Sequence, residues 1–313
     1  MKNTDEGLRR SHIFGRLKRL IEILLRHGFS GLQDEILNRR RLWTISDAHC
    51  VDGLTAAGQT SISDINSYLT ICELATENDA AFNRFRSCAE YRTILEHVTR
   101  TQGQLYLDAV RQNQKIAERL PILVFDDTGT PFRYSYSEIG RVSPTSLRYA
   151  KVLSDLDQLF GSLDKFVVSE IGIGFGGQCF QICKTHDIAR YELYDLESVL
   201  KLASKYIRNL IPTAPLDFPK MNSDLGSRDL LISNYSFSEL TRGVQETYME
   251  LIIENSARGY VTFNHITPPE WGSLSAQEFA NRIPGAEILE EIPLTYAKNV
   301  LVVWGHQGRL NHQ

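Results

Sequence analysis

The stretch VVSEIGIGFGGQCFQI, residues 167–182, constrains the fold of this chain more than any other part of its sequence. It opens with apolar or small residues and one acid, and glycine then fills four of the six positions from 172 to 177. Such a run predicts a buried strand that turns sharply into a helix, because glycine alone tolerates the backbone conformations of a tight turn. Packing alone does not require so many glycines, so we expect a ligand to approach bare backbone here.

Strand and helix patterns alternate after residue 165. Strand patterns occur, in order, in KFVVSEI, RYELYDL, DLLISNY, GYVTFNH, AEILEEI and NVLVVWG. Helical patterns separate the earlier ones, which predicts an α/β fold with a parallel, Rossmann-like sheet covered on both faces. Only PLTYAK separates the last two patterns, so we expect an antiparallel pair and hence a sheet with an antiparallel last strand.

The first part of the chain has a helical pattern instead. Apolar residues recur at spacings of three and four in LKRLIEILLRHG and from Tyr91 to Leu120. We expect a mostly helical domain over residues 1–120, a connector with a short hairpin over 121–142, and the α/β domain over 143–313. Ser143 and Pro144 predict the start of a helix, as N-cap and first helical residue.

Composition argues against several classes of function. The net charge of −4 leaves no basic footprint for nucleic acid. No apolar run approaches the ~18 residues of a membrane span, and the N-terminal apolar patch is too interrupted by charge for a signal peptide. Five cysteines without a C-x-x-C pair favour reduced thiols in a cytoplasmic protein without a zinc site.

An acid at the end of the next strand pattern suggests what the glycine turn binds. GIGFGG matches the dinucleotide pattern G-x-G-x-x-G, which is a weak signal alone. Asp195 is placed to accept hydrogen bonds from both ribose hydroxyls of an adenosine. The alternative is an N-cap for the helix that begins at Leu196 or Glu197. The favoured ligands therefore contain adenosine, namely NAD and S-adenosylmethionine.

Two features favour S-adenosylmethionine. Glu170 lies two residues before the first glycine, where a carboxylate would repel a pyrophosphate on the helix N-terminus. The same acid would attract the amino group and the sulfonium of S-adenosylmethionine. The expected antiparallel pair also closes the sheet as it does in methyltransferases.

Five blocks of sequence carry a family resemblance: SPTSLRYAKV, EIGIGFGGQC, YDLESV, LLISNYSFSEL and RGYVTFNHI. In this order they resemble the bacterial sugar O-methyltransferases, with Phe175 where the family usually has tyrosine. The resemblance covers roughly residues 120 to 306. It implies a class I methyltransferase fold, S-adenosyl-L-methionine as cofactor, and a sugar or glycan acceptor in surface glycan or polysaccharide biosynthesis.

The expected cofactor-binding residues lie at these turns and strand ends: Tyr149, Glu170, Gly172, Gly174, Gln178, Asp195, Leu196, Asn222, Asn234 and Tyr235. The acid and the glycines of the turn would hold the methionine part, and Asp195 the ribose. Asn222 lies in a loop that could reach the adenine. Arg148 and Tyr149 could fold over the donor carboxylate, although an arginine stem packed on the surface is the alternative.

Methyl transfer to a sugar hydroxyl needs a general base. The two candidates are His265, which follows the fourth strand pattern, and Glu239, which opens the helix after SNYSF. For each of them, the alternative to a role as general base is a purely structural role. His306 is excluded as a general base because it follows the last strand, and the carboxyl end of an antiparallel last strand points away from the site. No acidic pair follows the third or fourth strand pattern, so we expect no metal.

Two rival functions remain open on sequence grounds. One is an NAD(P)-dependent oxidoreductase on a similar sheet, and the other is a non-catalytic S-adenosylmethionine-binding scaffold protein. We further hypothesise that the N-terminal helices cap the acceptor pocket and mediate a homodimer.

Overall fold

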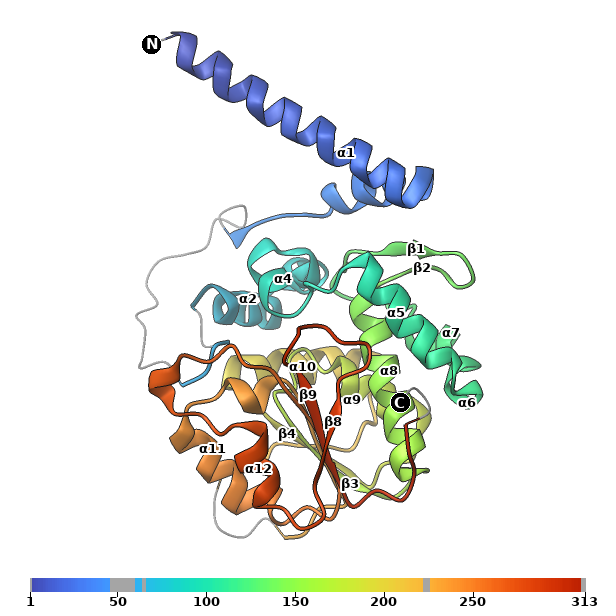
Figure 1. The fold of residues 1–313 in the computed structure, drawn as a ribbon, viewed down its shortest axis with the longest axis vertical. Helices are drawn as coiled ribbons and strands as arrows, with labels where there is room; N and C mark the ends of the chain where they lie inside the picture. The colour runs from blue at the N-terminus through green and yellow to red at the C-terminus, as the bar shows by residue number, and fades with distance from the viewer. Residues whose placement is uncertain (1, 46–59, 64–65, 222–225, 311–313) are drawn as a thin grey trace.

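The computed structural model describes residues 2–45, 60–63, 66–221 and 226–310 (Figure 1). A twisted sheet with helices on both faces forms the C-terminal half of the chain. Shorter helices of the N-terminal half lie over one end of this sheet, and the long helix α1 extends away from them. Across the described residues, no helix combines the length and apolar character that crossing a membrane requires.

The sheet has seven strands in the order β5-β4-β3-β6-β7-β9-β8. Their bounds are β3 (Val167–Ile171), β4 (Arg190–Tyr194), β5 (Leu216–Asp217), β6 (Leu230–Asn234), β7 (Gly259–Phe263), β8 (Glu287–Glu290) and β9 (Val300–Trp304). Strands β3 to β7 pair in parallel, and β9 runs antiparallel to both β7 and β8. The predicted fold class, a Rossmann-like α/β sheet with an antiparallel last strand, is confirmed.

The strand order reverses between β3 and β6. Strands β4 and β5 lie to one side of β3, and β6 and β7 lie to the other. The connecting helices are α9 (Gly177–Thr185), α10 (Glu197–Leu210) and α11 (Arg242–Tyr248), the last continued by a π-helical turn over Met249–Ile253. In open parallel sheets a ligand binds outside the carboxyl ends of the strands at such a reversal.

Alternate residues of β6, β7 and β9 face two different cores, as the two-residue period of a strand requires. In β6, Leu230 and Ile232 belong to the larger core with α9 and α10, whereas Leu231 belongs to the smaller core with α12 (Ala276–Asn281). The larger core continues into the N-terminal half, where Leu107 and Val110 of α5 are fully buried in it. The N-terminal helices therefore pack on the same core as the sheet.

The N-terminal half contains seven α-helices within its described residues. They are α1 (Lys2–Arg39), α2 (Asn66–Glu77), α3 (Asp79–Phe82), α4 (Ala89–Ile94), α5 (Arg100–Arg111), α6 (Gln114–Ala117) and α7 (Leu120–Leu123). The helical pattern between Tyr91 and Leu120 is thus broken. Thr99 begins α5 with a capping box to Gln102, and the Asn113 side chain caps α6. A loop over residues 95–98 results.

The connector forms the expected hairpin, β1 (Tyr134–Tyr136) paired with β2 (Gly140–Val142). Helix α8 (Pro144–Phe160) follows, with Ser143 as N-cap and Pro144 in the first turn, as predicted. The Ser143 hydroxyl makes no capping bond and accepts instead from the guanidinium of Arg86. Short 3-10 helices complete the chain at Phe85–Ser87, Ser236–Glu239 and Pro269–Trp271.

Candidate active site

A cavity of about 460 Å³ opens at the carboxyl ends of β3, β4 and β6. Its volume falls in the range of small-molecule sites, roughly 300–1,000 Å³. The structure brings seven of the sequence-predicted residues together in its wall: Gly172, Gly174, Asp195, Leu196, Asn234, Tyr235 and Glu239. These residues come from three strand ends that meet where the strand order reverses.

The glycine turn brings bare backbone to this cavity. Gly172 and Gly174 have left-handed backbone conformations, with φ of +80° and +54°. A Cβ atom added to Gly172 would lie 2.1 Å from the Cβ of Ser236, and one added to Gly174 would lie 2.9 Å from Cδ1 of Leu95. Glycine is therefore favoured by its backbone conformation at both positions, and at Gly172 it is also required by space.

Asp195 closes the end of β4 beside that turn. Its Oδ2 accepts a hydrogen bond from the Gly174 amide at 3.1 Å, and its Oδ1 accepts one from the Leu196 amide at 2.8 Å. Burial raises the pKa of Asp195 to about 6, against the opposing effect of these two bonds, so the carboxylate is mostly ionised at pH 7. Helix α10 begins at Glu197 with Leu196 as N-cap, so the alternative role of Asp195 as N-cap is not observed.

Two polar residues line the cavity from the end of β6. The Nδ2 atom of Asn234 is buried and has no hydrogen-bond partner among the described residues. Tyr235 has a φ of +69°, which is strained for a non-glycine residue, and its hydroxyl donates a hydrogen bond to Glu291. The Asn234 amide therefore offers a ligand an unused hydrogen-bond donor. The phenol ring of Tyr235 is fixed beside it by the hydrogen bond to Glu291.

The two candidate bases differ in placement. Glu239 lines the cavity, and its Oε1 accepts a hydrogen bond from Nδ2 of Asn264 at 2.5 Å. Burial raises the pKa of Glu239. His265 is exposed and is not among the cavity residues, although its neighbours Asn264 and Ile266 are. The structure therefore brings only one of the two candidates to the site.

Glu170 lies behind the cavity wall and not in it. Only 2% of its surface is exposed, and its Oε2 accepts a hydrogen bond from the Tyr191 hydroxyl at 2.6 Å. Burial raises the pKa of Glu170 to about 8, so the carboxyl group is mostly protonated at pH 7. The expected attraction between a charged Glu170 and a cationic ligand is therefore not supported.

Tyr149 and Gln178 also lie outside the cavity wall. The Tyr149 ring packs against Phe175 of the glycine turn with centroids 5.8 Å apart, and Nε2 of Gln178 donates to the Tyr149 carbonyl at 3.4 Å. Both side chains are buried and support the turn from behind. Asn222 falls outside the described residues, so its expected contact with adenine stays a prediction.

Residues far away in the sequence complete the cavity wall. The N-terminal half contributes residues 60–63 together with Tyr68, Leu95, His97 and Tyr106, and the segment between β8 and β9 contributes Thr295, Tyr296 and Asn299. Burial and the cationic Arg148 lower the pKa of His97 to about 4, so its imidazole is neutral at pH 7. No sequence signal marked these residues, because tertiary packing alone brings them to the sheet edge.

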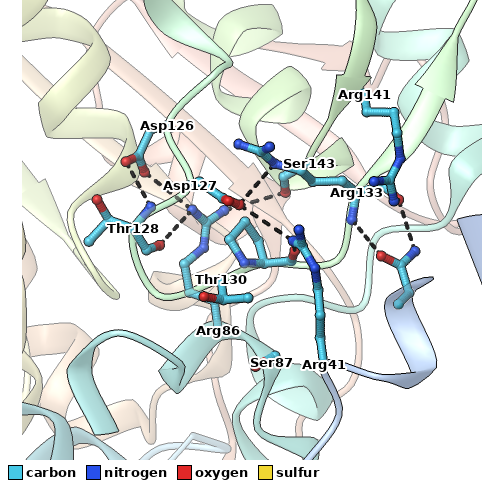
Figure 2. A network of polar contacts seen from close by, with 12 residues as sticks. Arg41, Arg86, Ser87, Asp126, Asp127, Thr128, Thr130, Arg133, Arg141 and Ser143 are labelled. Atoms are coloured by element: carbon cyan, nitrogen blue, oxygen red, sulfur yellow. Dashed lines mark hydrogen bonds and ion pairs between the residues drawn. The ribbon is translucent and has the colours of Figure 1, made fainter. Parts of the chain in front are cut away.

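A buried ion network fixes the 95–98 loop against the glycine turn. The fully buried Arg86 donates from Nε to Glu96 at 2.5 Å. Its other nitrogens reach Asp126 and Ser143 at 3.4 Å each (Figure 2). Its guanidinium carbon lies 4.4 Å from the centre of the Phe175 ring. Because Glu96 is flanked by two cavity residues, this network positions them over the turn.

No three His, Cys, Asp or Glu side chains gather to hold a metal ion anywhere in the described part of the chain. No protein-family model and no curated protein matches the sequence.

Solved structures of methyltransferases are similar to about half of the chain. One is magnesium protoporphyrin IX methyltransferase from Synechocystis PCC 6803 with bound SAH, at 13% identity over 50% of this chain and 82% of that chain, with a TM-score of 0.38. A SAM dependent methyltransferase from Aquifex aeolicus has 14% identity over 50% and 88%, with a TM-score of 0.35. The methyltransferase domain of bacterial CtHen1 has 11% identity over 50% and 96%, with a TM-score of 0.39. Because these scores are low, the function proposed below rests on the chain's own residues.

Proposed function

We propose that this chain is an S-adenosylmethionine-dependent O-methyltransferase that transfers a methyl group to a sugar hydroxyl. The observation that carries the proposal is the joint placement of Gly172, Gly174 and Asp195 on one cavity, in a sheet whose β9 runs antiparallel between β7 and β8. A bare-backbone turn beside an ionised carboxylate suits a ligand that contains adenosine. The antiparallel β9 supports a methyltransferase more than a dinucleotide-dependent enzyme.

The residues of the cavity fit this cofactor. The Asp195 carboxylate can accept hydrogen bonds from ribose hydroxyls, while Tyr68 and Tyr248 offer aromatic surface for the adenine. The backbone at Gly172 is open to close approach, and the Asn234 amide has an unused donor that can serve either the cofactor or the acceptor. Glu170 has no part in this assignment, because its carboxyl group is buried and mostly neutral.

When bound, S-adenosylmethionine supplies an electrophilic methyl group on a cationic sulfur. We assign the base to Glu239, because it faces the cavity and its raised pKa makes it a stronger base than an ordinary carboxylate. When the methyl group is transferred from the sulfonium sulfur to the acceptor oxygen, Glu239, which Asn264 holds in place, would accept the proton of the acceptor hydroxyl. A positioned base of this kind contributes about 10²–10⁴-fold.

We assign the N-terminal domain, residues 1–120, two tasks. Its residues 60–63 and its 95–98 loop line the cavity, which supports a role as cap over the acceptor. On α1, Leu25 and Phe29 are 80% and 83% exposed, which supports self-association through this helix. Light scattering tests the homodimer, and a monomeric mass at micromolar concentration would reject it.

The cofactor assignment is tested by ligand binding. S-adenosylhomocysteine should raise the melting temperature of the full-length protein, and NADH should not. Asp195→Asn should weaken the binding of S-adenosylhomocysteine about 10- to 100-fold, because charged hydrogen bonds to the ribose are lost. The exposed Glu118→Gln is the matched control and should change nothing.

The reaction is tested by transfer of isotope-labelled methyl groups to sugars and by mass spectrometry of surface glycans with and without the gene. The glycans made with the gene should carry one methyl group more than those made without it. Stabilisation by NADH but not by S-adenosyl compounds would identify an oxidoreductase instead. Cofactor binding without transfer to any glycan would identify a non-catalytic scaffold.

A further inference from the structure

Arg148, in the second turn of α8, is a buried cation that forms no ion pair with a described carboxylate. Only 8% of its surface is exposed, and its Nε has no hydrogen-bond partner in the described part of the chain. The other buried arginines are neutralised, because Arg86 pairs with Glu96 and Arg228 pairs with Glu192. A buried charge without a counter-charge is unfavourable. Arg148 is therefore suited to an anion that arrives with a ligand.

A second unused donor lies beside this cation. Arg148 and Asn234 both line the main cavity and a smaller space behind it, and the buried Nδ2 of Asn234 lacks a partner among the described residues. The guanidinium carbon lies 5.4 Å from the ring centre of Tyr149 and 5.9 Å from that of Tyr235. The Tyr235 hydroxyl is already donated to Glu291. A cationic donor and an amide donor on one wall form a site for an oxyanion.

Asp195 and Arg148 act on different residues of the cavity wall. Burial raises the pKa values of Tyr68 and Tyr248, and the charge of Asp195 adds to both shifts. Burial and the charge of Arg148 lower the pKa of His97, and the charge of Arg148 also acts on Glu239. Arg148 lines the same cavity as the proposed base.

We propose that Arg148 and the Asn234 amide form an anion subsite for the acceptor, which therefore carries a carboxylate or a phosphate group. An acidic sugar, such as a uronic acid or a sugar phosphate, meets this requirement. Its anionic group binds the cation, and one of its hydroxyls reaches Glu239. The inference rests on the proposed function and narrows its substrate class.

The test compares three probes that share one sugar ring: glucuronate, glucose 6-phosphate and neutral glucose. Binding to the full-length protein is measured by calorimetry, both alone and with saturating S-adenosylhomocysteine. Wild-type protein should bind at least one anionic probe about 10- to 100-fold more tightly than glucose, as a charge-assisted hydrogen bond predicts. The two anionic probes distinguish a carboxylate from a phosphate source.

Arg148→Met should abolish this preference and leave the affinity for S-adenosylhomocysteine within about twofold. Arg148→Lys should retain part of the preference, because it keeps the charge without the fork geometry. The exposed Arg208→Met removes one positive charge elsewhere and should retain the whole preference. Circular dichroism should show that Arg148→Met melts no lower than wild type without ligand, because it removes an unpaired buried charge.

Two results would overturn the proposal. One is that neither anionic probe binds more tightly than glucose. The other is that Arg148→Met weakens the binding of S-adenosylhomocysteine tenfold or more but leaves the binding of 5′-methylthioadenosine unchanged, since Arg148 would then hold the carboxylate of the donor. If S-adenosylhomocysteine itself fails to bind while Arg148-dependent anion binding persists, the proposed function fails and the anion subsite stands.

Discussion

Substituting alanine for Gly172 separates the two reasons for glycine at the turn that follows β3. Gly172 has a φ of +80°, and its added Cβ would lie 2.1 Å from the Cβ of Ser236. Gly140, in the connector hairpin, has nearly the same φ, +79°, and no atom within 4 Å of an added Cβ. Gly140→Ala therefore measures the conformational term alone, whereas Gly172→Ala measures the conformational and steric terms together.

The left-handed backbone should cost about 1–2 kcal/mol in either variant. Overlap with Ser236 should add about 1–3 kcal/mol for Gly172→Ala, the usual range for an overpacked methyl group. The free energy of unfolding, from reversible urea denaturation followed by circular dichroism, should thus fall by about 2–5 kcal/mol for Gly172→Ala and by about 1–2 kcal/mol for Gly140→Ala.

A double-mutant cycle with Ser236→Gly isolates the steric term. Combined with Gly172→Ala, this change should recover about 1–3 kcal/mol, and combined with Gly140→Ala it should recover nothing. Equal losses for the two alanine variants, or no coupling between positions 172 and 236, would refute the reasoning that the turn is pressed against Ser236.

Three further changes test other parts of the structure. Glu170 binds its proton more tightly in the folded protein, since burial raises its pKa from 4.5 to about 8. The free energy of unfolding should therefore fall as pH rises from about 4.5 to about 8, and Glu170→Gln should flatten this dependence on pH. A urea-midpoint profile that is unchanged in Glu170→Gln would contradict this. Glu96→Gln leaves Arg86 without its nearest carboxylate and should destabilise the protein by about 3–5 kcal/mol, so a loss below 1 kcal/mol in urea would argue against a tightly coupled pair. Tyr235→Phe removes the contact to Glu291 and should raise the KM for the acceptor more than it lowers kcat; initial-rate kinetics with the reverse pattern would count against a positioning role.

The sheet and the wall of the cavity that the strand ends form were predictable because local patterns determine them. Two-residue alternation marked the strands, and the polar residues directly after them, Asp195 and Asn234, had to lie at the carboxyl edge. Strand β5 escaped notice because it has only two residues and lies among prolines. His265 lies one position away from the cavity wall on either side, since Asn264 and Ile266 line the cavity and His265 between them is exposed.

The opposite wall of the cavity could not be predicted in this way. Leu95 and His97 reach the cavity only because a buried ion pair at Glu96 holds their loop, and nothing in the local sequence reports that contact. The charge of Glu170 was equally hidden. The sequence shows a carboxyl group beside the turn, but burial decides whether that group is ionised.

The cavity has walls of two origins: rigid strand ends on one side, and the 60–63, 95–98 and 295–299 segments on the other. Evolution can therefore revise the second set without rebuilding the first. We expect relatives with this sheet to diverge in which acceptor they bind through substitutions in those three short segments, while the turn at Gly172 and the acid at Asp195 stay constant.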